Sequence, residues 1–248
     1  MKPFLFVTDI DNTLLGDDLA LATLNQELKI HRQKYGTKIV YATGRSLFSY
    51  QILAREKLLL TPDALLTSVG TEIYFDPEIA QPDSDWSKIL AEGWNREKIV
   101  AICDRFDTLQ SQPESEQNPF KISYYLAQSA AENTILRLDN ALKTAGFQLQ
   151  FAYSSGQDLD LLPQNGDKGL AMEFLRRRWQ FSVASTVACG DCGNDIGMFR
   201  GLEKGIIVGN AKSELLDWYR INQRESLYLA RAYCANGVLE GLKYFGFL

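Results

Sequence analysis

FLFVTDIDNTLL, residues 4–15, is the stretch that decides the fold of this 248-residue chain. An almost wholly apolar run leads directly into two aspartates, Asp9 and Asp11, separated by one residue. Short apolar runs without strict alternation are typical of strands that are buried on both faces of a parallel sheet. The pattern therefore predicts a buried strand that ends in a pair of negative charges.

Four further segments share this character and predict the other strands of the sheet: TKIVYATG (37–44), DALLTSVG (63–70), STVACGD (185–191) and GIIVGNA (205–211). Helical periodicity fills most of the gaps between them, as in Leu21, Leu24 and Leu28, which precede a stop signal at Gly36. This alternation of strand and helix predicts an α/β fold with a doubly wound, Rossmann-like parallel sheet.

The alternation breaks between about residues 80 and 158, after the Pro- and Asp-rich stretch DPEIAQPDSD (76–85). This region predicts one or two helices, a strand, a long helix and two further strand-like pieces, with antiparallel pairing. We therefore expect a core domain made of residues 1–79 and 159–248, and a smaller α/β domain inserted at 80–158.

The overall charge excludes some classes of partner. The chain has 26 Lys and Arg against 31 Asp and Glu, a net charge of −5, so no global field would attract nucleic acid. The apolar runs are too short to cross a membrane, and the N-terminal residues lack the features of a signal peptide. We expect a cytoplasmic protein with no nucleic-acid or membrane partner.

Polar side chains follow the predicted strands at the points where they end. They are Asp9 and Asp11, Thr43 with Gly44 and Arg45, Gly70 with Thr71, Asp191 with Asn194 and Asp195, and Asn210. Ligand sites of open parallel sheets lie outside the carboxyl ends of the strands. Several carboxylates brought together there require a positive charge. Oxygen ligands without a histidine suit Mg²⁺.

Other site chemistries fit the sequence less well. Cys189 and Cys192 form a lone C-x-x-C, which lacks the second ligand pair that a structural zinc needs. A Ser/His/Asp triad has only one histidine available, His31, which lies in a predicted helix. A strand end with an Asx-type turn also explains DIDNT by itself, but not the whole set of motifs.

In chain order, the motifs are D-x-D-x-T, a strand-ending Thr, a lysine that opens a helix (Lys168 in NGDKG) and G-D-x-x-N-D. This set resembles the haloacid dehalogenase superfamily of phosphatases, and the insert resembles the larger cap domain of its sugar phosphatases. More narrowly, DIDNT, YATGRS, VGTEIY, EQNPFKISY, SSGQDLDLLP and CGDCGNDIGMF resemble the family of cyanobacterial sucrose-phosphate phosphatases. Asn12 departs from the glycine of many superfamily members, but asparagine tolerates the left-handed conformation.

The resemblance implies a role for each motif residue. Asp9 would be the nucleophile, Asp11 the general acid and base, and Thr43 and Lys168 would hold the phosphoryl oxygens. Mg²⁺ would be bound by Asp9, the backbone carbonyl of Asp11 and Asp191, with Asn194 and Asp195 orienting that shell. The residues expected to contact substrate are Gly44, Arg45, Gly70, Thr71, Glu72 and Asn194 from the core, and Asn118, Lys121, Tyr124, Ser155, Gln157 and Asp158 from the insert.

The activity implied is hydrolysis of sucrose 6-phosphate to sucrose and phosphate, a reaction of sucrose biosynthesis. Three alternatives stay open: a phosphatase for another sugar phosphate, such as trehalose phosphate or a phosphoglycerate glycoside, a phosphomutase of the same superfamily, and a non-enzymatic phosphosugar sensor. The proton donor Asp11 argues against a sensor. We expect a monomer that meets a small sugar phosphate and the synthase that forms sucrose phosphate.

Overall fold

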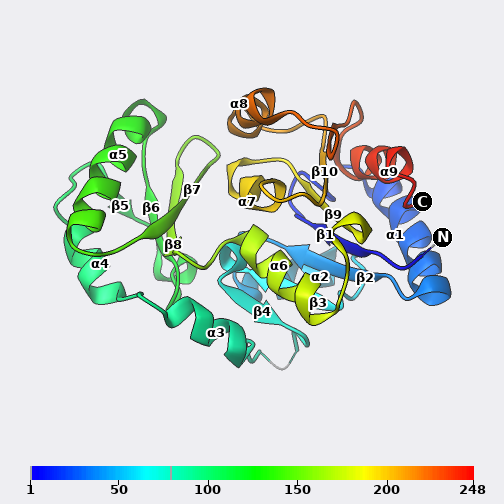
Figure 1. Cartoon of the computed structure of the whole chain (residues 1–248), viewed down its shortest axis with the longest axis horizontal. Coiled ribbons are helices and arrows are strands. Elements are labelled where there is room, and N and C mark those ends of the chain that lie inside the picture. Colours follow the sequence, from blue (N-terminus) through cyan, green and yellow to red (C-terminus); the bar gives the residue numbers. More distant parts are fainter. Residues whose placement is uncertain (1, 79) are drawn as a thin grey trace.

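The computed structural model describes residues 2–78 and 80–248, which form two units, each built on its own sheet (Figure 1). The large unit contains both chain termini, and the small unit lies at the opposite end of the molecule. Among the described residues, no helix combines the length and apolarity that crossing a bilayer demands.

The sheet of the large unit has seven strands in the order β11-β10-β9-β1-β2-β3-β4. Their bounds are β1 (Leu5–Thr8), β2 (Lys38–Ala42), β3 (Ala64–Thr67), β4 (Glu72–Tyr74), β9 (Thr186–Gly190), β10 (Lys204–Ile207) and β11 (Leu227–Leu229). All neighbouring pairs are parallel except β3 and β4, which are antiparallel. The predicted strands are confirmed, and β1 lies in the middle of the sheet.

Helices cover both faces of this sheet, as a doubly wound fold requires. Alternate residues of β1 point to opposite faces, where Phe6 packs with α1, α2 and α9, and Val7 packs with α3, α6, α7 and α8. The bounds are α1 (Asp18–Tyr35), α2 (Leu47–Glu56), α3 (Ser84–Ala91), α6 (Lys168–Arg178), α7 (Ile196–Phe199), α8 (Ser213–Asn222) and α9 (Cys234–Tyr244). Short 3₁₀ turns lie at η1 (Ser68–Gly70), η3 (Val183–Ser185) and η4 (Gly193–Asp195).

The small unit has a four-stranded antiparallel sheet in the order β5-β6-β8-β7. Its elements are α4 (Arg96–Cys103), β5 (Gln110–Ser111), η2 (Glu114–Glu116), β6 (Ile122–Tyr125), α5 (Gln128–Thr144), β7 (Leu149–Ser154) and β8 (Asp158–Pro163). The helices α4 and α5 pack on one face of the sheet and enclose a separate apolar core around Ile122, Leu138 and Leu161. The other face is turned toward the large unit.

The predicted domain limits differ from this arrangement at both ends of the insert. Every residue of β8 pairs with β7, so the small sheet extends to Pro163, past the boundary predicted between residues 158 and 159. The helix α3, predicted in the insert, packs through Trp86 and Leu90 against the large sheet. The other boundary falls at residue 79, which lies outside the described residues.

Candidate active site

Four strand or helix ends meet at one edge of the large sheet, and each contributes a polar residue. Asp9 follows β1, Thr43 follows β2, Asp191 follows β9, and Lys168 is the first residue of α6. Adjacent parallel strands end at the same edge, so pairing of β1 with β2 and β9 brings these residues together. The sequence predicted this convergence.

A buried lysine links two carboxylates at this edge. Lys168 Nζ lies 2.8 Å from Asp9 Oδ1 and 2.7 Å from Asp195 Oδ1, and the lysine side chain has no exposed surface. Burial alone would lower the pKa of Lys168, but the carboxylates of Asp195 and Asp9 raise it above its usual value. Lys168 is therefore charged and holds Asp9 in one position.

The carboxylates at the edge are electrostatically strained in the protein alone. Burial raises the pKa of Asp9 well above its usual value, and Asp195 and Asp191 add to this effect against the opposing charge of Lys168. Burial, followed by the charge of Asp195, raises the pKa of Asp191 to about 7. A cation bound between Asp9 and Asp191 would favour the ionised form of both.

Asp195 organises the loop that follows β9. Its Oδ2 accepts the backbone N–H groups of Asp191 (3.0 Å) and Cys192 (3.1 Å), while its Oδ1 contacts Lys168. Donor atoms of Asp191, Cys192 and Asp195 lie within 4.8 Å of one another. However, both oxygens of Asp195 already have protein partners and a thiol is a poor ligand for Mg²⁺, so this geometry favours Asp195 as a residue that positions Asp191.

Two glycines allow backbone segments to approach the site closely. A side chain on Gly70, whose φ is +86°, would lie 2.6 Å from the carbonyl oxygen of Asp167, directly before Lys168. A side chain on Gly193 would clash with the carbonyl oxygen of Tyr153 in β7. Gly70 thus lets α6 begin beside η1, and Gly193 lets the small unit rest on the loop of Asp191.

Asp11 is held by an arginine. Arg45 Nε donates to Asp11 Oδ2 at 2.7 Å, and Arg45 Nη2 donates to Asp11 Oδ1 at 2.8 Å. Arg45 Nη1 donates to Ser49 Oγ in the first turn of α2 at 2.9 Å. Both carboxylate oxygens of Asp11 are therefore engaged in a two-pronged ion pair.

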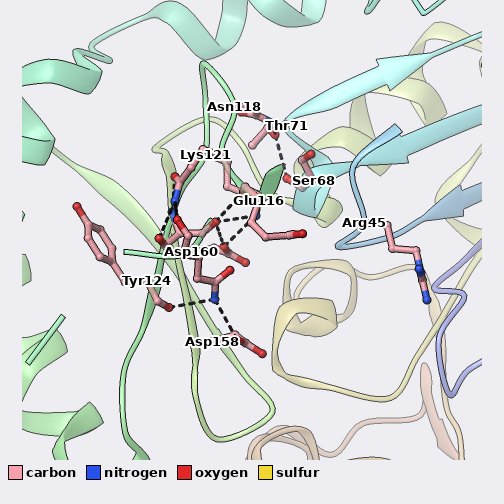
Figure 2. Close-up of polar contacts among 12 residues, drawn as sticks. Arg45, Ser68, Thr71, Glu116, Asn118, Lys121, Tyr124, Asp158 and Asp160 are labelled. Carbon is pink, nitrogen blue, oxygen red and sulfur yellow. Dashed lines mark hydrogen bonds and ion pairs between the residues drawn. The ribbon is translucent and has the colours of Figure 1, made fainter. Parts of the chain in front are cut away.

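The small unit presents a polar network toward this edge (Figure 2). Lys121 is 3% exposed, and its Nζ lies 2.7 Å from Ser123 Oγ and 3.2 Å from Asp160 Oδ1. Ser123 Oγ also lies 2.6 Å from Asp160 Oδ1. Beside it, Gln112 Nε2 donates to Asp158 Oδ1 at 3.0 Å. These bonds fix two carboxylates of β8 in place.

Hydrogen bonds join the units on either side of the site. Asn118 Nδ2 donates to Thr71 Oγ1 at 2.9 Å (Figure 2). At the tip of the β7–β8 hairpin, Ser155 N donates to Glu214 Oε1 in α8 at 3.0 Å. Ser155 has a left-handed φ of +57°, so this bond supports a strained backbone position.

A cavity of about 510 Å³ lies between the two units, a size suited to a small polar ligand. Ten of the predicted site residues line it: Asp9, Asp11, Gly44, Arg45, Lys121, Ser155, Gln157, Asp158, Asp191 and Asn194. Residues of both units therefore meet in one cavity.

Other predicted residues lie beneath or beside the cavity. Thr43 is fully buried next to Gly44, Lys168 and Asp195 lie under Asp9 and Asp191, and Gly70, Thr71 and Asn118 lie at contacts between elements. Glu72 accepts hydrogen bonds from Thr67 Oγ1 and Ser68 Oγ, so its carboxylate stabilises the turn between β3 and β4.

Tyr124 is a correction to the predicted substrate contacts. Its ring packs in the apolar core of the small unit, whereas Tyr125 lines the cavity. Successive side chains of a strand point to opposite faces, so only one of two adjacent tyrosines can face the site.

Several cavity residues were not predicted from the sequence: Asn12, Ser49, Gln112, Pro113, Glu116, Tyr125, Ser154, Asp160, Cys192 and Lys212. Asp160 carried a usable signal, because it follows Asp158 by two residues on one strand and must share its face. Gln112, Glu116 and Lys212 lie in loops or at loop ends, where periodicity gives no direction.

Comparison with known proteins agrees with this geometry. The family model described as sucrose-6F-phosphate phosphohydrolase matches residues 2–246. The chain belongs to this family. The resemblance to sucrose-phosphate phosphatases of the haloacid dehalogenase superfamily is thereby confirmed, as is the fold class.

Three similar proteins show the range of sequence and structural similarity. The structure of a Synechocystis sucrose-phosphatase in complex with sucrose and phosphate has a TM-score of 0.92 and 40% identity, covering 99% of this chain and 98% of that chain. A probable sucrose-phosphatase 2 of Arabidopsis thaliana is 34% identical over 97% of this chain, which spans only 59% of that relative's length. A mannosylfructose-phosphate phosphatase of Agrobacterium fabrum is 30% identical, covering 99% of this chain and 98% of the relative.

Proposed function

We propose that this protein is a Mg²⁺-dependent phosphatase that hydrolyses sucrose 6-phosphate through an aspartyl-phosphate intermediate. One observation carries the proposal: Asp9, fixed by Lys168, lies in the same cavity as the paired Asp11 and the polar face of the small unit. A nucleophile, a proton donor and groups for sugar hydroxyls thus share one site. Membership of the family and the relative crystallised with sucrose and phosphate support sucrose 6-phosphate as the substrate.

The donor set fits Mg²⁺. Asp9 and Asp191 offer carboxylates whose ionised form is costly without a cation, and the backbone carbonyl of Asp11 offers a further oxygen. Asn194 also lines the cavity and has an amide oxygen. When bound, the metal would neutralise charge on the phosphoryl oxygens.

The chain's own residues account for the covalent steps. Lys168 binds Oδ1 of Asp9, which leaves Oδ2 to form the bond to phosphorus. The bond between phosphorus and the sugar oxygen breaks, its electron pair stays on that oxygen, and Asp11, which has to carry a proton at this stage, transfers that proton to the oxygen. Asp11 then takes a proton from water, which attacks phosphorus and displaces Asp9, releasing phosphate. Lys168 and Thr43 would stabilise the charge of the transferring group.

We further propose that the small unit acts as a cap that recognises the sugar. Lys121, Ser155, Gln157 and Asp158 line the cavity on that side, and Gln112 and Asp160 hold or extend this polar surface. Action as a monomer and contact with the synthase that forms sucrose phosphate stay predictions.

A second candidate function is hydrolysis of a different disaccharide phosphate. The mannosylfructose-phosphate phosphatase matches nearly the full length of both chains, so the same core serves another sugar in that protein. The residues around Asp9 hold only phosphate and metal, and they do not read the sugar.

The test is release of inorganic phosphate from a panel of sugar phosphates with Mg²⁺ present. We expect sucrose 6-phosphate to have the highest kcat/KM, with mannosylfructose phosphate, trehalose phosphate and hexose 6-phosphates lower. Asp9→Asn should abolish turnover of all of them. A higher kcat/KM on another sugar phosphate would replace the substrate, and formation of an isomeric sugar phosphate without free phosphate would indicate a phosphomutase.

A further inference from the structure

We propose that Arg45 is a positioning residue for Asp11, which it holds in the orientation needed to protonate the leaving sugar oxygen. The inference rests on the proposed function, because it assumes that Asp11 is the general acid. It assigns Arg45 a different task from the substrate contact that its place in the cavity first suggests.

The guanidinium is fully committed on the side that faces Asp11. Nε and Nη2 engage the two carboxylate oxygens at 2.7 and 2.8 Å, and Nη1 engages Ser49 at 2.9 Å. A phosphate that bound the same edge of Arg45 would have to break the pair with Asp11. The geometry therefore favours action through Asp11 over direct contact with substrate.

The backbone of Arg45 is as firmly placed as its side chain. Its N–H donates to Thr43 Oγ1 at 3.1 Å, and its carbonyl accepts the N–H of Ser68 at 2.8 Å. These bonds tie Arg45 to the end of β2 and to η1, two rigid parts of the large unit. Arg45 can thus transmit a fixed geometry to a side chain on a turn.

Asp11 needs such a support. It lies in the turn after β1, its side chain is 40% exposed, and no other side chain within residues 2–78 and 80–248 donates a hydrogen bond to it. A two-pronged pair fixes the rotation of a carboxylate, whereas a single point charge does not. Two other cations near the site contact other acids: Lys168 contacts Asp9 and Asp195, and Lys121 contacts Asp160. Lys212 also lines the cavity, but within the described part of the chain it forms no ion pair with Asp11.

The experiment compares two leaving groups in single-turnover measurements with the magnesium-loaded protein. Arg45→Gln should slow formation of the phosphoenzyme from sucrose 6-phosphate by about 10- to 100-fold, the scale of a misplaced general acid. With p-nitrophenyl phosphate, whose leaving group needs no proton, the burst of nitrophenol should stay within about threefold of wild type. Because water activation also uses Asp11, the steady rate after the burst should fall, so aspartyl phosphate accumulates.

Matched variants make the result specific. Arg45→Lys keeps the positive charge but loses the two-pronged hydrogen bonding of the guanidinium. We therefore expect it to recover less than half of the rate lost in Arg45→Gln, measured on a logarithmic scale. Arg220→Gln removes an arginine–aspartate pair on the surface of α8, with Asp217, and should behave as wild type. Thermal unfolding checks that each variant is folded, and Arg45→Lys replaces Arg45→Gln if the latter is not.

Three outcomes would overturn the inference: equal losses on both substrates, a rise in KM with unchanged kcat, or full rescue by lysine. The first outcome would indicate that Arg45 contacts the phosphoryl group directly, and the second that it contacts the sugar. Asp11→Asn separates this failure from that of the proposed function. If Asp11→Asn shows the leaving-group difference and Arg45→Gln does not, only the inference fails, whereas if neither shows it, the role of Asp11 fails.

Discussion

Asp195 and Asp191 lie in the same loop but differ in how many of their carboxylate oxygens are free to bind a ligand. Asp195 has no exposed surface, and both of its oxygens contact groups of the protein, whereas Asp191 receives a single side-chain hydrogen bond, from Thr13 at 2.9 Å, and lines the cavity. The free capacity for a ligand is therefore on Asp191. The residue pattern alone places both acids in one motif, and only the family resemblance implied that Asp191 binds the metal while Asp195 orients the ligands.

The first prediction concerns Asp191→Asn and metal binding. Since Asp191 would lose a charged ligand oxygen, most of the Mg²⁺ affinity measured by calorimetry should disappear. Wild-type protein should gain about 2.7 kcal/mol of stability at roughly 100 times Kd, and the variant should gain little. A variant that binds Mg²⁺ with the wild-type Kd would exclude Asp191 as a ligand.

The same variant has an expected effect without metal. Burial, with Asp195 beside it, raises the pKa of Asp191 from 3.8 to about 7 in the folded protein. The folded protein therefore loses stability as the pH rises through this interval, because ionising Asp191 costs more in the folded than in the unfolded state. Asparagine carries no charge, and the metal-free variant should unfold at the same or a higher temperature than wild type at pH 8. The control is Asp85→Asn, whose exposed carboxylate pairs with Lys88 on α3 and should change neither measurement.

At the scale of elements, α1 shows local signals agreeing with the final structure. Asp17 caps its first turn through bonds to the N–H groups of Leu19 and Ala20, and Gly36 ends it with a φ of +81°. Leu21, Leu24 and Leu28 pack on the sheet as their spacing predicted. His31, which the sequence placed in this helix and outside any triad, is buried and contacts Thr37 Oγ1 at 2.7 Å.

His31 leads to a prediction on pH. Its Nε2 is buried with no hydrogen-bond partner among the described residues, and burial lowers its pKa below 6.5, with the charge of Lys34 adding to this effect. Below pH 6.5 the unfolded chain takes up a proton that the folded protein resists, so stability falls as the pH drops. His31→Asn should reduce the slope of unfolding free energy against pH, between pH 7 and 5, by at most about 1.4 kcal/mol per unit.

The measurement is urea unfolding of both proteins across this range, since acids that titrate in both cancel in the difference. Parallel slopes would show that His31 accepts its proton freely in the folded state. The bonds of His31 with Thr37 and its packing between the rings of Phe4 and Tyr35 affect stability at all pH values, so they shift the curves without changing their slopes.

Strands were predicted better than the faces they present. The five buried strands of the large sheet could be predicted because both of their faces are apolar. Such a strand is recognised without deciding which residue points to which face. In β6 the pattern is FKISYY, where tyrosine can occupy either face, and the sequence assigned Tyr124 to the cavity instead of Tyr125. In β8 the run LDLLP resembles a core strand, which explains the misplaced boundary.

At the scale of the whole molecule, the core motifs were predictable, but the cavity residues of the small unit were not. The core residues follow strand ends, which a parallel sheet necessarily brings together. The cap residues come from β6, η2 and the β7–β8 hairpin, whose meeting depends on how the small unit sits on the large one. Gln112 and Glu116 line the cavity only because of this placement.

The third prediction tests the division of labour between the units. Asp158 lines the cavity and receives Gln112, so Asp158→Asn should lower kcat/KM for sucrose 6-phosphate by about tenfold, within the 1–3 kcal/mol expected for one unpaired polar group. A small aryl phosphate, which does not reach the cap, should change by less than about twofold. A constant ratio of the two values would mean that this part of the cap does not read the sugar.

Asp158 is a cleaner site for this test than Lys121. Removal of Lys121 would leave the carboxylate of Asp160 buried without its cation, which destabilises the small unit as well as the site. Asp107→Asn is the matched control, because Asp107 is an exposed acid of the small unit outside the cavity lining.

The contact between Gly193 and β7 limits how the two units can evolve separately. The residue belongs to the loop that carries Asp191 and Asn194, yet what forbids a side chain there is the carbonyl of Tyr153 in the small unit. The nearby group from the large unit is the Cγ of Glu214 in α8, which belongs to a flexible side chain that can move. Because the insert rests on this loop, an insert of another shape would clash with the loop that carries Asp191 and Asn194 or leave that loop without support. The small unit therefore cannot be exchanged independently of the large unit. A chimaera with a foreign insert would also need a matching loop after β9.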